Sequence, residues 1–480
     1  MKKLNKDLSR FAKFEAGLAD SSTTGMRLVF SALFIVAVLA YVLFGQSSGD
    51  MSLMVVAAGV IGAYMAINIG ANDVANNIGP AVGSKALTLI GALVIAAIFE
   101  AAGAMIAGGD VISTIRKGII DPSGIQDANV FVWAMMSALL AAALWLNLAT
   151  FVGAPVSTTH SIVGGVVGAG IAAAGFAAVN WPKMGAIAAS WVISPLLGGI
   201  IAAAFLLFIK KMILAPDDKL AAARKWVPVL VGIMAGAFSM YLVMKGLKKL
   251  WKADTLELWG IGLATLIIVW AVTRPMVARA AESLENRKKS IAKLFTIPLI
   301  FSAALLSFAH GANDVANAVG PLAAIVGVVE SGGDLAAKVT IPLWVMIIGA
   351  LGISVGLLLF GPKLIRTVGQ EITKLNQIRA FCVALSAAIT VIAASWMGLP
   401  VSSTHIAVGG VFGVGFLREY LSARNSNNIL TEKKIKKAEK RKLVRRRHLL
   451  QIAAAWVITV PVAAALSGGL FFALTAIFDS

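Results

Sequence analysis

Long apolar runs alternate with short charged segments along the whole chain. A helix that crosses a bilayer needs about 20 mostly apolar residues, and the apolar positions suffice for about a dozen such helices. Backbone groups inside a bilayer must be hydrogen-bonded internally, which a helix achieves. The pattern therefore predicts an all-α polytopic membrane protein.

Two motifs occur twice in the same order, at nearly equal separation. Residues 70–80 (GANDVANNIGP) recur as residues 311–321 (GANDVANAVGP), and residues 155–160 (PVSTTH) recur as residues 400–405 (PVSSTH). Self-similarity of this kind indicates a duplicated structural unit.

The apolar runs divide the chain around these two units. The first run, with dispersed charges before it and no cleavage pattern after it, is read as an uncleaved extra transmembrane helix. The predicted parts are a cytoplasmic N-terminus with this first helix (1–50), transport repeat 1 (51–209), connecting helices and basic loops (210–292), and transport repeat 2 (293–480) including a basic cytoplasmic loop (418–447).

Basic segments predict the orientation, because cytoplasmic loops carry an excess of Lys and Arg. The N-terminal segment and the segments 210–225, 274–293 and 418–447 are all rich in these residues. If all four are cytoplasmic, the first unit runs from outside to inside and the second runs the opposite way. We therefore predict two inverted repeats, with the N-terminus inside and the C-terminus outside. Four lysines do not fit this scheme, because it places them on the outer side of the membrane: Lys245, Lys248, Lys249 and Lys252.

An inverted unit must cross the membrane an odd number of times, yet each unit contains about six apolar pieces. At least one piece per unit must therefore be re-entrant or discontinuous. The segments around Pro155 and Pro400 are the best candidates, since proline disfavours helix before it and hydroxyls satisfy freed backbone groups. Five crossings per unit, two connecting helices and the first helix predict about 13 transmembrane helices.

Composition excludes several classes of protein. Of 480 residues, 59% are hydrophobic and 14% are charged, whereas soluble domains carry about 25% charged residues. A soluble enzyme and a secreted disulfide scaffold are excluded, and the single cysteine, Cys382, is expected to be a packing residue. The net charge of +19 is confined to the loops, so no nucleic-acid partner is expected.

Two carboxylates, Asp73 and Asp314, lie inside apolar stretches, where a charge is costly and by default functional. Each is flanked by asparagines, and carboxylate, amide and freed carbonyl oxygens can replace the water shell of sodium. The alternative is that they only hydrogen-bond helices together. Glu100, which has no evident counterpart in the second unit, adds an asymmetric cation site or pairs with a polar neighbour. The predicted cation-binding residues are Asn72, Asp73, Asn76, Asn313, Asp314, Asn317 and Glu100.

Three consecutive hydroxyls in each proline motif stand at the expected start of a helix, where unpaired N–H groups and the helix dipole favour an anion. The alternative is simple N-capping. The predicted anion-binding residues are Ser157, Thr158, Thr159, Ser402, Ser403 and Thr404. For His160, His310 and His405 we favour structural hydrogen bonding over proton transfer.

The chain has no metal-ligand spacing of Cys or His, no phosphate-binding loop for ATP and no nucleophile elbow. We therefore expect no enzymatic activity and no cofactor. Transport would be driven by an ion gradient.

These motifs resemble the PiT family of inorganic phosphate transporters. Besides the duplicated motifs, residues 99–104 (FEAAGA) are similar to that family, and residues 114–121 (TIRKGIID) are similar to its sodium-coupled members. This chain departs from the family by its extra first helix and by Asn77, which stands opposite Ala318 in the other repeat.

The resemblance implies symport of phosphate with sodium across the cytoplasmic membrane. It implies that Asp73, Asn76, Asp314 and Asn317 serve sodium and substrate, and that the six hydroxyls of the proline motifs hold phosphate. Related permeases carry sulfate, and others couple protons to metal-phosphate, so both stay alternatives. An anion channel and a membrane scaffold that recruits partners through residues 418–447 are less favoured. Expected partners are phosphate, sodium and the lipid bilayer, and a homo-oligomer is left open.

Overall fold

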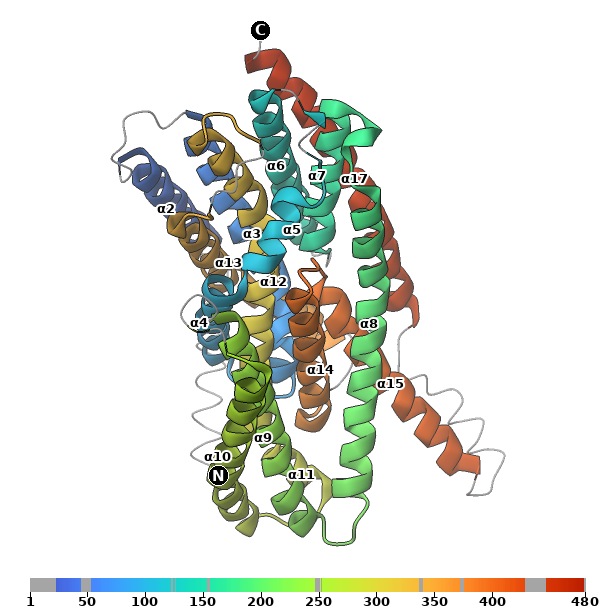
Figure 1. The fold of residues 1–480 in the computed structure, drawn as a ribbon. Coiled ribbons are helices and arrows are strands. Elements are labelled where there is room, and N and C mark those ends of the chain that lie inside the picture. Colours follow the sequence, from blue (N-terminus) through green and yellow to red (C-terminus); the bar gives the residue numbers. More distant parts are fainter. Residues whose placement is uncertain are drawn as a thin grey trace.

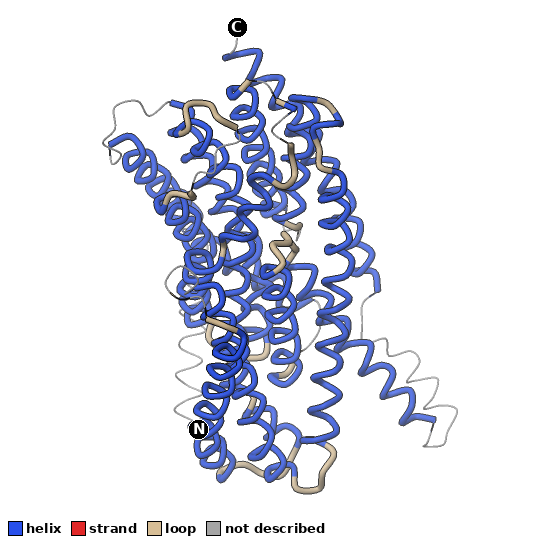
Figure 2. The backbone as a smooth tube through the Cα atoms, viewed as in Figure 1, coloured by secondary structure: helices blue, strands red, loops and turns tan. Residues whose placement is uncertain are grey.

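The computed structural model is almost entirely helical, and no strand occurs among the residues that it describes (Figure 2). The description covers residues 23–44, 53–121, 124–125, 127–152, 156–246, 251, 253–335, 340–371, 375–427 and 446–478.

Helices in the first half of the chain begin with the additional N-terminal helix. They are α2 (Thr23–Phe44), α3 (Leu53–Gly83), α4 (Leu89–Ala107), α5 (Gly109–Lys117), α6 (Ala128–Val152), α7 (Thr158–Ala174), the 3₁₀-helix η2 (Phe176–Ala178), α8 (Trp181–Ile209) and the π-helix η3 (Lys210–Leu214).

The second half continues from a pair of connecting helices. Its helices are α9 (Lys219–Gly246), α10 (Thr255–Glu282), α11 (Lys288–Leu294), α12 (Thr296–Glu330), α13 (Leu343–Glu371), α14 (Gln377–Trp396), α15 (Ser403–Asn427) and α17 (Arg446–Phe478).

Among the described residues, 11 helices are long and apolar enough to cross a membrane, and α7 is a shorter apolar helix. The predicted all-α multi-pass architecture is thus confirmed. The number of 13 transmembrane helices stays a prediction, as do the inverted repeats and the boundaries of the four parts.

The long helices pack in pairs that exchange partners between the two predicted units. Helix α3 lies along α13 and α12 lies along α4, while α15 packs on α8 and α17 on α7. Glycines allow these close approaches. A Cβ atom on Gly70 would overlap the carbonyl oxygen of Ile353, and one on Gly311 would overlap that of Glu100. The two crossings therefore have the same form, with Glu100 standing where the other crossing has Ile353.

The segments that follow Pro155 and Pro400 lie at the tips of two helical hairpins, α6–α7 and α14–α15; Pro155 itself lies outside the described residues. Figure 1 shows α6 and α7 between the upper end of the molecule and its middle, α14 below the middle, and α15 running from the middle out to the lower right. The two tips meet, because the Thr159 hydroxyl in one donates to the Val401 carbonyl in the other at 2.9 Å. The chain turns back at Pro400, as predicted for that segment, whereas the prediction for Pro155 falls outside the described residues.

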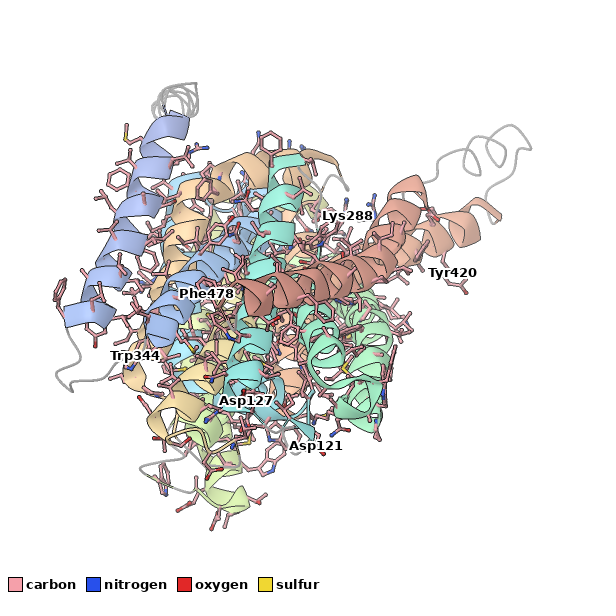
Figure 3. The ribbon with its side chains drawn as sticks, turned by 90° about the horizontal axis from the view of Figure 1, so that it is seen from above. Asp121, Asp127, Lys288, Trp344, Tyr420 and Phe478 are labelled. Atoms are coloured by element: carbon pink, nitrogen blue, oxygen red, sulfur yellow. The ribbon has the colours of Figure 1, made fainter. Side chains whose placement is uncertain are left out.

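The remaining helices lie at the periphery. Helix α2 packs on α3 and α13, and α9 and α10 pack mainly on each other. Seen from above in Figure 3, α17 crosses that face of the molecule and α15 leaves it on one side. Cys382 is buried in α14, which fits the packing role expected for it.

Candidate functional site

The two aspartates meet in the middle of the molecule, on either side of His310. His310 Nε2 lies 2.9 Å from Asp314 Oδ2 and 3.7 Å from Asp73 Oδ2. All three side chains are at most 1% exposed. Helices α3 and α12, which occupy corresponding positions in the two predicted units, therefore bring their carboxylates to one buried centre.

Hydroxyls from the hairpin tips complete the surroundings of these carboxylates. The Thr404 hydroxyl donates to Asp73 Oδ1 at 2.8 Å and accepts from the Asn76 amide at 2.7 Å. The hydroxyls of Thr158 and Ser403 each lie 3.4 Å from Asp314 Oδ2.

Asn317 repeats the role of Asn76 in the second unit. Its amide donates to the hydroxyls of Thr158 and Thr159 at 3.3 Å each. Each aspartate–asparagine pair thus contacts the hairpin of the other unit.

The serines that open the two motifs act as helix caps. The Ser157 hydroxyl accepts from the backbone N–H of His160 at 3.1 Å, and the Ser402 hydroxyl accepts from that of His405 at 3.3 Å. The rings of His160 and His405 lie against each other at a tilt, with centroids 4.5 Å apart. Two helix N-termini, each with the positive end of a helix dipole, therefore face each other across the centre.

Asn72 and Asn313 contact other parts of the structure. The Asn72 amide donates to the Thr150 hydroxyl at the end of α6, at 3.2 Å. The Asn313 amide donates to the Ser395 hydroxyl at 2.9 Å, and its oxygen accepts from the Val401 backbone N–H at 3.2 Å. These two amides hold the hairpins against α3 and α12, whereas Asn76 and Asn317 contact the hydroxyls at the tips.

A polar triad of Asn77, Glu100 and His310 extends the centre on one side only. Glu100 Oε1 accepts from the Asn77 amide at 2.8 Å, and Glu100 Oε2 lies 3.2 Å from His310 Nδ1. The corresponding positions in the other unit hold Ala318, Ile353 and Ile69. From the sequence we predicted no site role for His310 or Asn77. A signal was present in the sequence, because Asn77 and His310 are polar where the other repeat has the apolar residues Ala318 and Ile69. In the structure these polar residues contact Glu100.

Several buried oxygens at the centre have no hydrogen-bond donor among the described residues. They include Asp73 Oδ2, Asp314 Oδ1 and Asn317 Oδ1. Ligating atoms of Asp73, His310 and Asp314 also lie within 4.8 Å of one another, a spacing that can hold a metal ion. Unpaired carboxylate and amide oxygens suit a hard cation such as sodium, so the residues present fit the predicted cation.

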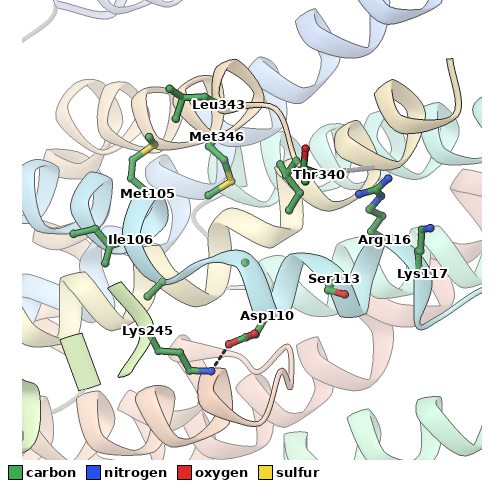
Figure 4. Close-up of a pocket in the computed structure, with 13 residues that line it drawn as sticks. Met105, Ile106, Asp110, Ser113, Arg116, Lys117, Lys245, Thr340, Leu343 and Met346 are labelled. Carbon is green, nitrogen blue, oxygen red and sulfur yellow. Dashed lines mark hydrogen bonds and ion pairs between the residues drawn. The ribbon is translucent and has the colours of Figure 1, made fainter. Parts of the chain in front are cut away.

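A cavity of about 670 Å³ lies beside α5 (Figure 4). Arg116, Lys117 and the ion pair between Lys245 and Asp110 line it. The charge of Lys245 is thus paired locally with Asp110. Lys245 is one of the four lysines that do not fit the predicted orientation. None of the predicted site residues lines the cavity.

Comparison with known proteins shows what this chain is similar to. Residues 69–467 match the model of the phosphate transporter family (PHO4). A candidate phosphate permease of Helicobacter pylori strain J99 is 46% identical, over 98% of both chains. One of Pyrococcus abyssi is 38% identical, over 88% of this chain and 98% of its own length. A solved structure described as the sodium-dependent phosphate transporter is 34% identical, with a TM-score of 0.80 over 89% of this chain and all of its own. The chain therefore belongs to the phosphate transporter family.

Proposed function

We propose that this multi-pass membrane protein is a secondary active transporter that carries inorganic phosphate together with sodium across the cytoplasmic membrane. The family match supports phosphate as the substrate, and the likeness to a solved sodium-dependent phosphate transporter supports sodium as the coupling ion. The proposal includes two inverted repeats, since the helices of the two units exchange partners in corresponding pairs.

One observation carries the proposal: two carboxylates and two helix N-termini share a single buried centre. Asp73 and Asp314 supply negative charge and oxygen ligands for cations. The starts of α7 and α15 supply N–H groups and positive dipole ends for an anion. Cations and anion bound side by side would neutralise one another, which lowers the cost of moving either through a bilayer.

Different residues of the centre are assigned to phosphate and to sodium. In this mechanism Thr158, Thr159, Ser403 and Thr404 turn their hydroxyls toward phosphate, while Ser157 and Ser402 fix the helix starts from which those hydroxyls project. The side-chain oxygens of four residues would coordinate sodium: Asp73, Asn76, Asp314 and Asn317. Glu100 holds His310 against both aspartates and so sets the charge of the centre.

Transport would follow from a rocking movement of the two units around this centre. The aspartate–asparagine pair of each unit contacts the hairpin of the other, so bound ions bridge the units. Movement of one unit relative to the other would then open the centre to the opposite side of the membrane.

A second candidate is proton-coupled transport of phosphate or of a metal-phosphate complex. The observation in its favour is His310, which is enclosed by the carboxylates of Asp73, Glu100 and Asp314. An imidazole among carboxylates is a common route for protons. Sulfate is the alternative substrate, because its shape and oxygens resemble those of phosphate.

Uptake into vesicles that contain the purified protein separates these candidates. We expect labelled phosphate to accumulate against its gradient when sodium is high outside, with no accumulation when a proton gradient replaces sodium. Preference for sulfate, or for protons, would replace the proposed substrate or coupling ion. Equilibration without uphill accumulation would indicate a channel and contradict the proposal.

A further inference from the structure

Four cations from four different elements lie at one end of the molecule. Helix α8 ends there, and helix α11 begins there. The cations are Lys210 on η3, Arg379 on α14, Arg418 on α15 and Lys288 on α11, and together they are called the cation cluster. Their elements adjoin one another, since η3 continues α8, α15 packs on α8, and α14 packs on α15 and contacts α11. Like charges held on these adjoining elements repel one another. Figure 3 shows Lys288 on the side of the molecule where α15 and its Tyr420 project.

The backbone fixes the positions of these cations. Lys210 begins a π-helix, a rare element that is often found at functional sites. The backbone N–H of Arg379 is capped by Asn376 at 3.1 Å. Arg418 follows the close contact of Gly413 with Gly199, which ties α15 to α8. Lys210, Arg379 and Arg418 are partly buried, so these side chains lie between elements.

Among the described residues, Lys210, Lys288 and Arg418 have no carboxylate within the 4.0 Å that defines an ion pair. Gathering partly buried like charges is unfavourable, so an anion between them would stabilise the structure. Phosphate groups carry high charge on several acceptor oxygens, and arginine binds them through two parallel hydrogen bonds. Basic pockets between helices at the cytoplasmic side bind phosphate headgroups in this way.

We propose that the cation cluster is a second anion site, which binds the phosphate group of an anionic phospholipid or free phosphate. The site is separate from the hairpin tips. Helix α15 starts at Ser403 in the centre and reaches Arg418 15 residues later, which at 1.5 Å per residue is about 22 Å away. The cluster is therefore spatially distinct from the proposed transport site.

Thermal unfolding of the full-length protein in lipid nanodiscs tests this site. Sodium is replaced by choline throughout, so that the proposed transport site is not loaded. One arm compares nanodiscs of phosphatidylcholine with nanodiscs that also contain phosphatidylglycerol. The other arm adds inorganic phosphate to phosphatidylcholine nanodiscs. Each arm is run on the wild type, on K210Q/R418Q, and on the control R224Q/K289Q, which removes one exposed lysine and one exposed arginine.

We expect one of the two ligands to raise the unfolding temperature of the wild type and the control. K210Q/R418Q should lose this rise, or need at least a tenfold higher ligand concentration for it. The arm that responds identifies the source of the phosphate group. Equal responses in all three proteins, or no response in any, would overturn the proposal. If K210Q/R418Q does not fold, exposed Lys288→Gln against its neighbour Lys289→Gln gives the same comparison with a partial loss.

Discussion

Three carboxylates surround one imidazole at the centre of this protein, and none of the four side chains is more than 1% exposed. A buried charge is tolerated only where partners compensate it. Here Asn77 and His310 compensate Glu100, and Thr404 compensates Asp73, whereas Asp314 Oδ1 has no donor among the described residues. Asp73 Oδ2 likewise has no donor among the described residues, so the centre is short of positive charge at both aspartates, and a cation would supply it.

The two aspartates should be required for coupling. Replacing Asp73 or Asp314 by asparagine keeps the shape but removes the charge that holds sodium. We expect sodium-dependent phosphate uptake into vesicles to fall at least tenfold in either variant, a loss of about 1.4 kcal/mol. The exposed Glu285→Gln is the control. Wild-type uptake in Asp73→Asn or Asp314→Asn would remove these carboxylates from the mechanism.

The polar triad should show strong energetic coupling. Glu100→Ile alone leaves His310 and Asn77 buried without their partner, which we expect to cost about 1–3 kcal/mol of stability. Adding Asn77→Ala and His310→Ile, which installs the residues of the other crossing, should recover part of that loss. Thermal unfolding of the single and triple variants measures both. A triple variant whose stability equals the sum of the single losses would show that the triad is not coupled.

At the scale of helices, the structure depends on two hairpins whose tips meet and on glycine crossings that bring α3 and α12 against their partners. The chain reversal at Pro400 was predictable, because proline and consecutive hydroxyls mark such a break. The repeated motif indicated that Asp73 and Asp314 are equivalent residues, and the structure adds that they meet at one centre. The different partners of Asn72 and Asn76 were not predictable, since helical spacing places both on one face without showing which neighbouring helix each contacts.

The glycine crossing beside the triad should not tolerate a methyl group. A Cβ atom on Gly311 would overlap the Glu100 carbonyl oxygen, so we expect Gly311→Ala to lower stability by about 1–3 kcal/mol and to reduce uptake. Gly79→Ala is the matched control, because nothing lies within 4 Å of its added Cβ and alanine favours helix. Similar unfolding temperatures for the two variants would show that this crossing is loosely packed.

At the scale of the whole molecule, the two predicted units form one site by exchanging contacts. Thr114 on α5 adds a further connection, since its hydroxyl donates to the Gly398 carbonyl in the tip of the α14–α15 hairpin at 2.7 Å. The sequence predicted the duplication but not this link. Repeated motifs reveal which segments correspond, whereas contacts between non-corresponding segments leave no periodic signal.

The orientation can be tested by labelling. In a Cys382→Ala background, Phe176→Cys on η2 and Asp217→Cys in the turn before α9 place exposed thiols on opposite predicted sides. A maleimide that does not cross membranes should label Phe176→Cys in intact cells and Asp217→Cys only after permeabilisation. The reverse pattern would invert the predicted orientation, including the positions of both termini.

The hydrogen bond from Thr404 to Asp73, and those from Asn317 to Thr158 and Thr159, join residues of different units. Neither predicted unit therefore contains all the residues proposed to bind the ions. If the two units separate, ions bound between them would lose part of their ligands. Release of phosphate and sodium would then follow directly from the separation of the two units, without a separate gating element.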